Sequence, residues 1–192
     1  MMLLGSGCFS HAIGFRCGIE WGYTGTFYES HHYNYLSDAG ARVDVNSGGS
    51  VYYSNGELLG YAGMTMGRSL ELDLMLGWAG VVQGRRVMPL MARGTYFING
   101  CCSDGVKLFA DGGICIADTF GSTLTPIARL GCGYRLMLTG RTALDISAAL
   151  QGVSDHPSDV YAAEYRYTVP VESLRRSDRL YAGLTFSLAL SF

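Results

Sequence analysis

The chain of 192 residues contains no run of apolar residues near the ~18 that a transmembrane helix requires. Charged residues are scarce, at 16% against roughly 25% in a typical soluble domain. The net charge is −2 and the basic residues are scattered, so the chain lacks the positive surface that binds nucleic acid. It has instead 27 glycines and 13 tyrosines, and glycine weakens helices whereas tyrosine favours strands. The composition predicts a single β domain with no nucleic-acid partner.

Metal-binding cysteine patterns are also missing. The six cysteines form no CxxC pair, and no histidine lies at zinc-ligand spacing from them. The adjacent Cys101 and Cys102 are poorly placed to bond to each other, because such a disulfide strains the peptide between them. Cys17 and Cys132 fall at apolar positions of predicted strands and are interpreted as small hydrophobic side chains. We predict no metal site and no cofactor.

The first twelve residues, MMLLGSGCFSHA, differ from the rest of the chain. A short apolar piece followed by Ser10-His11-Ala12 resembles the cleavage end of a secretory signal, without its basic start and most of its apolar core. The segment from Gly5 to Cys8 is similar to a lipoprotein cleavage box, but Gly5 stands where leucine is expected. Residues 1–12 are therefore predicted to be a signal-peptide remnant or a disordered tail, and residues 13–192 a barrel domain.

Alternation of apolar residues with small or charged ones recurs along the chain and predicts β-strands. It is clearest in residues 15–24, 70–78, 128–138 and 180–192, and weaker in residues 58–67, 88–98, 106–119 and 143–152. Short turns alternate with longer connections, and two of these, residues 28–50 and 153–177, are predicted to be long loops. The pattern predicts an all-β fold, an eight-stranded antiparallel up-and-down β-barrel.

Alternation alone allows the apolar face to point inward, as in a soluble lipocalin-like barrel, or outward toward lipid. The opposite face mixes glycine with charges of both signs, which suits the narrow interior of an eight-stranded barrel. Aromatic residues such as Trp21, Trp78 and Phe192 lie toward strand ends, as interfacial girdles do. We therefore predict a transmembrane barrel whose lumen is plugged by paired charges, with a narrow ion path as the alternative. The predicted lumenal charge network is Arg16, Glu20, Asp73, Arg93, Asp111, Arg129, Arg135 and Asp145.

The closing strand from Arg179 to Phe192 and the hairpin from Ala128 to Ile146 resemble the small outer-membrane β-barrel families of Gram-negative bacteria, especially those of Bacteroidetes. The resemblance implies porin-like architecture, location in the bacterial outer membrane, and contact with its lipid and lipopolysaccharide. It also implies that the barrel-assembly machinery recognises a terminal signal formed by Phe186, Leu188, Leu190 and Phe192. These families are defined by the barrel and not by a reaction, so the resemblance implies no particular chemistry.

Histidines offer the main candidates for catalysis. His31 and His32 fall in the first long connection and His156 in the last, all outside the predicted strands. Ser30 or Ser154 with His156 and Asp155 would supply the groups of a Ser–His–carboxylate site, but such residues are common in exposed loops. A metal held by the His31–His32 pair is a further alternative. No catalytic residue is therefore predicted.

Tyrosines in the long connections have two interpretations. They form a recognition surface for an unknown ligand, or they extend the hairpins above the membrane, with Asn55-Gly56 as a bend. The residues are Tyr33, Tyr35, Tyr52, Tyr53, Tyr161, Tyr165 and Tyr167. We predict a non-enzymatic integral outer-membrane protein whose loops contact other surfaces or anchor it. The alternatives are a membrane-embedded lipid A hydrolase or acyltransferase and a soluble lipocalin-like ligand-binding barrel.

Overall fold

A computed structural model describes residues 14–37, 40–82, 85–118, 125–157, 160–162 and 167–192. The predictions for residues 1–12 and for Tyr165 lie outside these residues. One 3-10 helix, η1 (Val171–Ser173), is present in the described part of the chain. The strands are β1 (Gly14–Leu36), β2 (Arg42–Met66), β3 (Leu70–Val82), β4 (Arg85–Phe97), β5 (Gly105–Asp118), β6 (Thr125–Met137), β7 (Ala143–Asp155), β8 (Val160–Ala162), β9 (Tyr167–Val169) and β10 (Leu174–Ser191).

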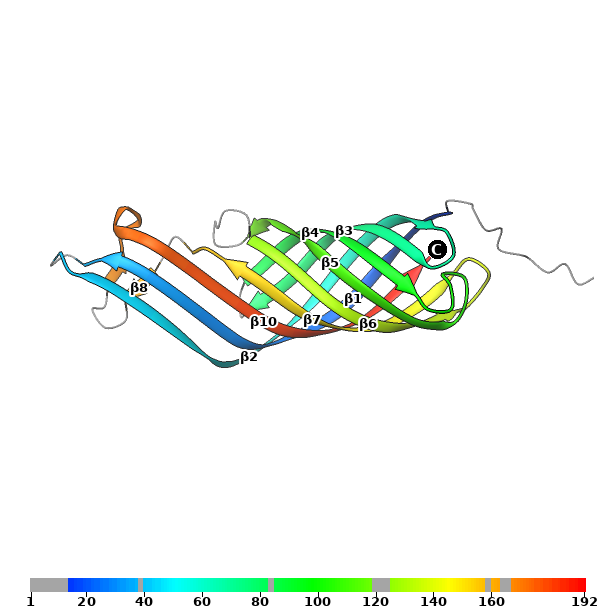
Figure 1. Cartoon of the computed structure of the whole chain (residues 1–192), viewed down its shortest axis with the longest axis horizontal. Helices are drawn as coiled ribbons and strands as arrows, with labels where there is room; N and C mark the ends of the chain where they lie inside the picture. Colours follow the sequence, from blue (N-terminus) through cyan, green and yellow to red (C-terminus); the bar gives the residue numbers. More distant parts are fainter. Residues whose placement is uncertain (1–13, 38–39, 83–84, 119–124, 158–159, 163–166) are drawn as a thin grey trace, which may run out of the picture.

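Eight of these strands close into an antiparallel ring in the order β1-β10-β7-β6-β5-β4-β3-β2 (Figure 1). The ring closes because β1, the first strand, pairs with both β10 and β2. This confirms the predicted all-β, eight-stranded up-and-down barrel. The short strands β8 and β9 form a separate two-stranded sheet in the connection from β7 to β10. Among the described residues, no helix is long and apolar enough to cross a membrane.

The predicted apolar faces point outward around the whole barrel. On β3, Leu74 is 65% exposed while the next residue, Met75, is 1% exposed. On β6, Leu130 is 68% exposed between the buried Arg129 and the inward-facing Gly131. A water-soluble barrel would bury these leucines, because exposing them to water is unfavourable. An apolar exterior around a charged interior fits a barrel whose wall faces lipid.

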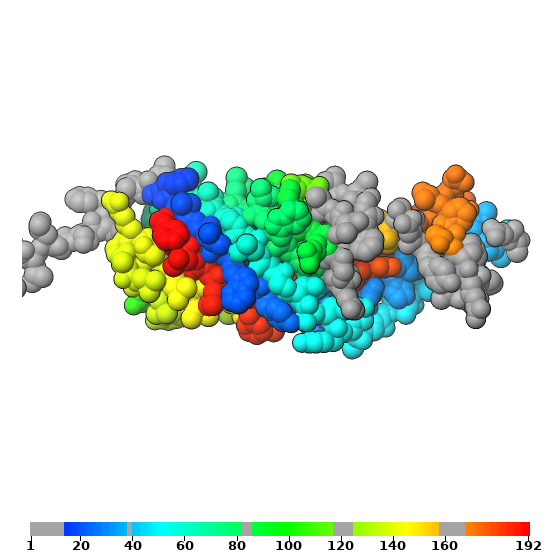
Figure 2. All heavy atoms as spheres, turned by 180° about the vertical axis from the view of Figure 1, so that it is seen from behind, coloured from blue at the N-terminus to red at the C-terminus, as the bar shows by residue number. Residues whose placement is uncertain are grey.

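Three strands run well beyond the ring. The continuation consists of residues 27–36 of β1, 42–52 of β2 and 174–178 of β10, and we call this three-stranded sheet the extension. In Figure 1 it projects to the left of the barrel, at the end opposite the C-terminus. Figure 2 shows the barrel from behind, where β10 (red) lies between β7 (yellow) and β1 (blue), as in the strand order given above.

The extension corrects the prediction that residues 28–50 form a long loop. Both arms of that segment are strands, joined by a turn in which Ser37 and Ala41 bond to each other. His31 and His32 therefore lie on β1, not in a loop, and Asn55-Gly56 lies inside β2 rather than at a bend. The alternation of residues 15–24 does not continue in phase into this segment, because β1 carries a bulge at Phe27. The bulge exchanges the faces that odd and even residues occupy.

The other end of the barrel carries the short turns. They span residues 67–69, 98–104 and 138–142, between β2 and β3, β4 and β5, and β6 and β7. Gly67 opens the first of them at φ +70°, in the left-handed region that glycine enters without strain. The C-terminus lies at this end too, where Phe192 donates a backbone hydrogen bond to Cys17 at 2.9 Å. The barrel thus has short turns at one end and a tall sheet at the other.

Candidate functional site

Charged side chains from strands on opposite sides of the ring meet in the lumen. The guanidinium of Arg129 on β6 donates to both carboxylate oxygens of Glu57 on β2, at 3.1 and 2.6 Å. β6 and β2 are four places apart in the ring of eight, so this bidentate pair spans the full width of the barrel. Both side chains are 1% exposed. Burial of such a charge is tolerated only where a partner neutralises it.

A second crossing lies closer to the short turns. Arg93 on β4 donates two hydrogen bonds to its neighbour Asp111 on β5, at 2.7 and 2.8 Å. The same guanidinium also bonds both oxygens of Glu20 on β1, three places away in the ring. One arginine therefore neutralises two carboxylates and fixes three strands relative to one another. Its fork geometry suits such bidentate contacts.

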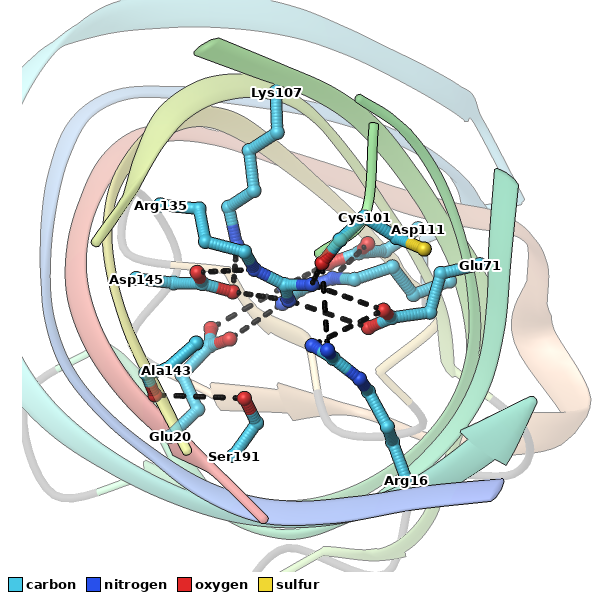
Figure 3. A network of polar contacts seen from close by, with 11 residues as sticks. Arg16, Glu20, Glu71, Cys101, Lys107, Asp111, Arg135, Ala143, Asp145 and Ser191 are labelled. Atoms are coloured by element: carbon cyan, nitrogen blue, oxygen red, sulfur yellow. Dashed lines mark hydrogen bonds and ion pairs between the residues drawn. The ribbon is translucent and has the colours of Figure 1, made fainter. Parts of the chain in front are cut away.

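The third crossing forms the largest cluster (Figure 3). Arg135 on β6 bonds Asp145 on β7 at 2.8 Å through each of two nitrogens, and reaches Glu71 on β3 at 3.2 Å. Lys107 approaches the same Asp145 at 2.9 Å. Arg16 lies 3.9 Å from Glu71, and its guanidinium donates to the backbone oxygen of Cys101 at 3.3 Å. The turn after β4 thereby covers the charged interior at the barrel end with the short turns.

Two phenylalanine rings support the guanidinium groups. The Cζ atom of Arg135 lies 4.1 Å from the ring centre of Phe97, and that of Arg93 lies 4.4 Å from Phe109. Both rings are buried inside the barrel. A desolvated cation over an aromatic face gains electrostatic stabilisation, and the rings also fill space beside the arginine stems. The lumen is thus packed with aromatic as well as charged groups.

All eight charged residues predicted for the lumen lie on the inner face, each 8% exposed or less. Seven of them join the crossings described above. The eighth, Asp73, lies beside Arg93 in register, but its Oδ1 atom has no hydrogen-bond partner. Sequence reasoning left Glu57, Glu71 and Lys107 out of the network. The last two alternate with outward-facing leucines on β3 and β5, which was the available signal for both.

A layer of buried, mainly apolar side chains lies at the barrel end nearest the extension and was not predicted. Its side chains are 3% exposed or less and come from the strand ends nearest the extension: Val81, Val87, Ile127, Val153 and Tyr181. Inward-facing apolar residues at strand ends break the alternation of apolar outside and polar inside. The sequence therefore gave no simple pattern from which to predict this layer.

His32 and His156 each pair with a carboxylate. The Nε2 atom of His32 lies 2.7 Å from Asp44 Oδ1, and this hydrogen bond lowers the pKa of the exposed Asp44 carboxyl. His156 contacts Asp178 at 2.9 Å, and not Asp155 as the triad hypothesis requires. Asp155 is fully buried instead and accepts a hydrogen bond from Thr125. The alternative Ser–His–carboxylate site is therefore not assembled from His156 and Asp155 in the described residues.

The neighbouring histidine His31 does not cooperate with His32. The His31 ring stacks on the ring of Tyr33, with the ring centres 5.2 Å apart. Both lie on the face of β1 opposite to His32. Within the ranges that the structure describes, no three histidine, cysteine or acidic side chains are grouped closely enough to hold a metal ion. The tyrosines of the first arm serve the extension itself, where Tyr35 is buried against Val169 of β9.

The four residues of the predicted assembly signal lie on the outer face of β10 at the barrel end with short turns. Phe186, Leu188 and Phe192 are between 43% and 58% exposed, and Leu190 is half-buried. Their side chains thus line one lipid-facing strip, interrupted by the inward-facing Ser187, Ala189 and Ser191.

No protein-family model matches this chain, and no curated protein matches it. Solved structures of similar shape include the outer-membrane protein OprG from Pseudomonas aeruginosa, at 11% identity and a TM-score of 0.48, covering 95% of this chain and 96% of that one. The outer-membrane protease OmpT from Escherichia coli is also similar, at 9% identity and a TM-score of 0.33, covering 96% and 99% of the two chains. Similarity this low assigns no activity to the chain.

Proposed function

We propose that this protein is a non-enzymatic integral protein of a bacterial outer membrane, with a closed lumen and an external sheet that contacts other surfaces. The observation that carries the closed lumen is the set of ion pairs that cross it, of which Arg129–Glu57 spans the full ring. An eight-stranded barrel is just wide enough to be filled by side chains. The buried, mainly apolar side chains at the barrel end nearest the extension also support a closed lumen, because apolar groups do not solvate an ion.

The shape of the barrel supports this location. Its outside is apolar, its three turns at one end are short, and its extension projects from the other end. In outer-membrane barrels the short turns face the periplasm and the longer segments face outward. The extension then stands outside the cell, with the β2 edge from Arg42 to Gly56 paired only to β1 among the described residues. An unpaired edge of this kind is a natural surface for contact with another chain.

Conductance in planar bilayers tests the closed lumen. The purified protein should insert without producing stepwise currents above background. A positive control replaces by serine each crossing pair together with the other charges that depend on it: Glu20, Arg93 and Asp111; Glu57 and Arg129; and Arg16, Glu71 and Arg135. Lys107 and Asp145 stay paired with each other. This variant should conduct if it folds, and its folding is checked by heat-modifiable migration on a gel. Regular open-channel currents from the natural protein would contradict the proposal.

The orientation is tested on whole cells. An epitope inserted at Gly40, in the turn at the tip of the extension, should bind antibody on intact cells. The same epitope inserted at Gly140, in a short turn, should bind only after the outer membrane is permeabilised. The reverse result would place the extension in the periplasm and contradict an external contact surface.

We also propose that the chain belongs to the small outer-membrane β-barrel proteins of the kind found in Bacteroidetes. This assignment rests on the segments from Ala128 to Ile146 and from Arg179 to Phe192, which form the β6–β7 hairpin and the closing strand β10. We propose that the barrel-assembly machinery recognises the strip Phe186, Leu188, Leu190 and Phe192. Phe192→Ala, which keeps the backbone hydrogen bond to Cys17, should reduce the folded fraction in cells with little change in the stability of protein refolded in detergent.

A further inference from the structure

The barrel wall has a discontinuity between β2 and β3. Their ladder ends at the pair Glu57–Ala79, and no later pair joins the two strands in the described residues, although β3 continues to Val82. The C-terminal end of β3 is instead bonded from within the lumen. Thr26 donates a side-chain hydrogen bond to the backbone oxygen of Val81 at 2.8 Å. A cleft of about 760 Å³ opens on the outer side of the gap.

One end of the cleft is apolar and aromatic. Trp21, Leu58 and Trp78 are direct neighbours in register across β1, β2 and β3. All three side chains point outward and are 63%, 53% and 59% exposed. They make a strip on the lipid-facing wall with a leucine between two indoles. Such a strip suits an acyl chain.

The other end of the cleft is polar. Asn55 wedges its side chain against Gly80, where a Cβ atom would lie only 2.4 Å from Asn55 Cβ, so glycine is required for this approach. Asn55 lines this cleft, and its buried Nδ2 group has no hydrogen-bond partner among the residues that the structure describes. A buried donor without an acceptor is unfavourable and favours a ligand that supplies one. The exposed Arg86, which pairs with Gly80 across β3 and β4, adds a positive charge at the rim.

We propose that this cleft binds a single anionic amphiphile, with its acyl chain along Trp21, Leu58 and Trp78 and its phosphate or carboxylate headgroup at Asn55 and Arg86. The order of the two zones agrees with a lipid of the outer leaflet, because the polar zone is the one nearer the extension. Glu57 also lines the cleft, but both of its oxygens accept hydrogen bonds from Arg129, so its charge is compensated. The inference rests on the proposed lipid-facing wall and adds a specific ligand to it.

The chain itself supplies the reporter for a test, because its only two tryptophans are Trp21 and Trp78. Full-length protein in neutral detergent micelles is titrated with phosphatidic acid carrying brominated chains, which quench indole fluorescence on contact. Phosphatidylcholine with the same brominated chains provides the zwitterionic comparison. We expect phosphatidic acid to half-saturate the quenching at a concentration about fivefold lower, because charge-assisted hydrogen bonds favour its headgroup.

Variants identify the polar zone. Asn55→Leu combined with Arg86→Gln should remove the preference for phosphatidic acid and leave the weaker quenching by both lipids. Arg86→Gln alone, at an exposed position, should give an intermediate preference. Arg141→Gln, an exposed arginine in a short turn at the other end of the barrel, is the matched control and should retain the full preference.

Three results would overturn the proposal. Equal quenching by the two lipids in the natural protein would indicate non-selective boundary lipid only. An unchanged preference in a folded double variant would place the headgroup elsewhere. Release of phosphatidic acid by an equal concentration of inorganic phosphate would show that the acyl chain contributes nothing. Heat-modifiable migration of every sample separates these outcomes from failure of the barrel itself.

Discussion

The same three strands build two regions with opposite chemistry. Within the barrel, β1 alternates exposed Ile19, Trp21 and Tyr23 with inward-facing residues such as Glu20. Beyond the bulge at Phe27, the strand continues as hydrogen-bonded sheet, but its side chains are polar on both faces. The backbone is alike in both regions, and the surroundings differ. This difference is the one expected if the barrel wall faces lipid and a filled lumen, whereas the extension faces water on both sides.

The barrel and the extension also hold two different kinds of ion pair. In the barrel, Arg93 with Glu20 and Asp111 is buried, and all three side chains are 5% exposed or less. In the extension, the pair of His32 and Asp44 has side chains 27% and 57% exposed. Water screens the second pair, so its formation contributes little to stability. Removing one member of the first leaves charges that water cannot solvate.

The largest effect is expected from Arg93→Met, which keeps the apolar stem of the side chain and removes its charge. Glu20 and Asp111 are then left buried without their partner, which costs about 3–5 kcal/mol of unfolding free energy. Urea unfolding of protein reconstituted in vesicles, followed by tryptophan fluorescence, measures this change. Arg42→Met is the counterpart in the extension, where the arginine is exposed and donates to Asn34 at 3.0 Å.

The matched variant in the extension should cost only about 1 kcal/mol, because it leaves no buried charge without a partner and only the buried Asn34 oxygen loses its donor. Adding Glu20→Gln and Asp111→Asn to Arg93→Met should recover much of the lost stability, since uncharged partners need no counter-charge. If Arg42→Met and Arg93→Met destabilised the protein equally, the two regions would not differ as proposed.

A smaller effect is expected when a charge is placed on the outer wall. Leu74→Arg introduces an arginine at a position 65% exposed in the middle of β3, and this should cost about 2–4 kcal/mol in a bilayer. Val45→Arg, at a half-exposed position of the extension, should change the unfolding free energy by less than about 0.5 kcal/mol. The same urea titrations compare the two. An equal cost for both variants would place the extension within the membrane, and no cost for Leu74→Arg would mean that the wall does not face lipid.

The sequence was sufficient to predict the strands of the barrel, whose apolar residues face outward. All eight strands of the ring were predicted, most of them from clear alternation, whereas residues 58–67 are apolar on both faces and did not reveal their register. Residues 28–50 were predicted as a loop because their polar side chains on both faces resemble loop composition, and the bulge at Phe27 shifts the phase. The cross-lumen partners could not be predicted, because Arg129 and Glu57 meet only after the ring closes. The cleft at Asn55 depends on where one ladder stops, which alternation does not specify.

The smallest effect concerns the exposed pair of the extension and its response to pH. The hydrogen bond from His32 lowers the pKa of Asp44 in the folded sheet relative to about 3.9 in an unfolded chain. Ionised Asp44 therefore favours the folded hairpin above pH ~4, and this contribution is lost as the pH falls through the lowered folded-state pKa. A titration of the Asp44 carboxyl carbon by NMR should show a midpoint below the unfolded value. His32→Ala should raise that midpoint, whereas His31→Ala, on the opposite face of β1, should leave it in place. Equal midpoints in the natural protein and His32→Ala would mean that water screens even this contact completely. The extension would then owe its order to its backbone ladders and to the packing of Tyr35 on Val169.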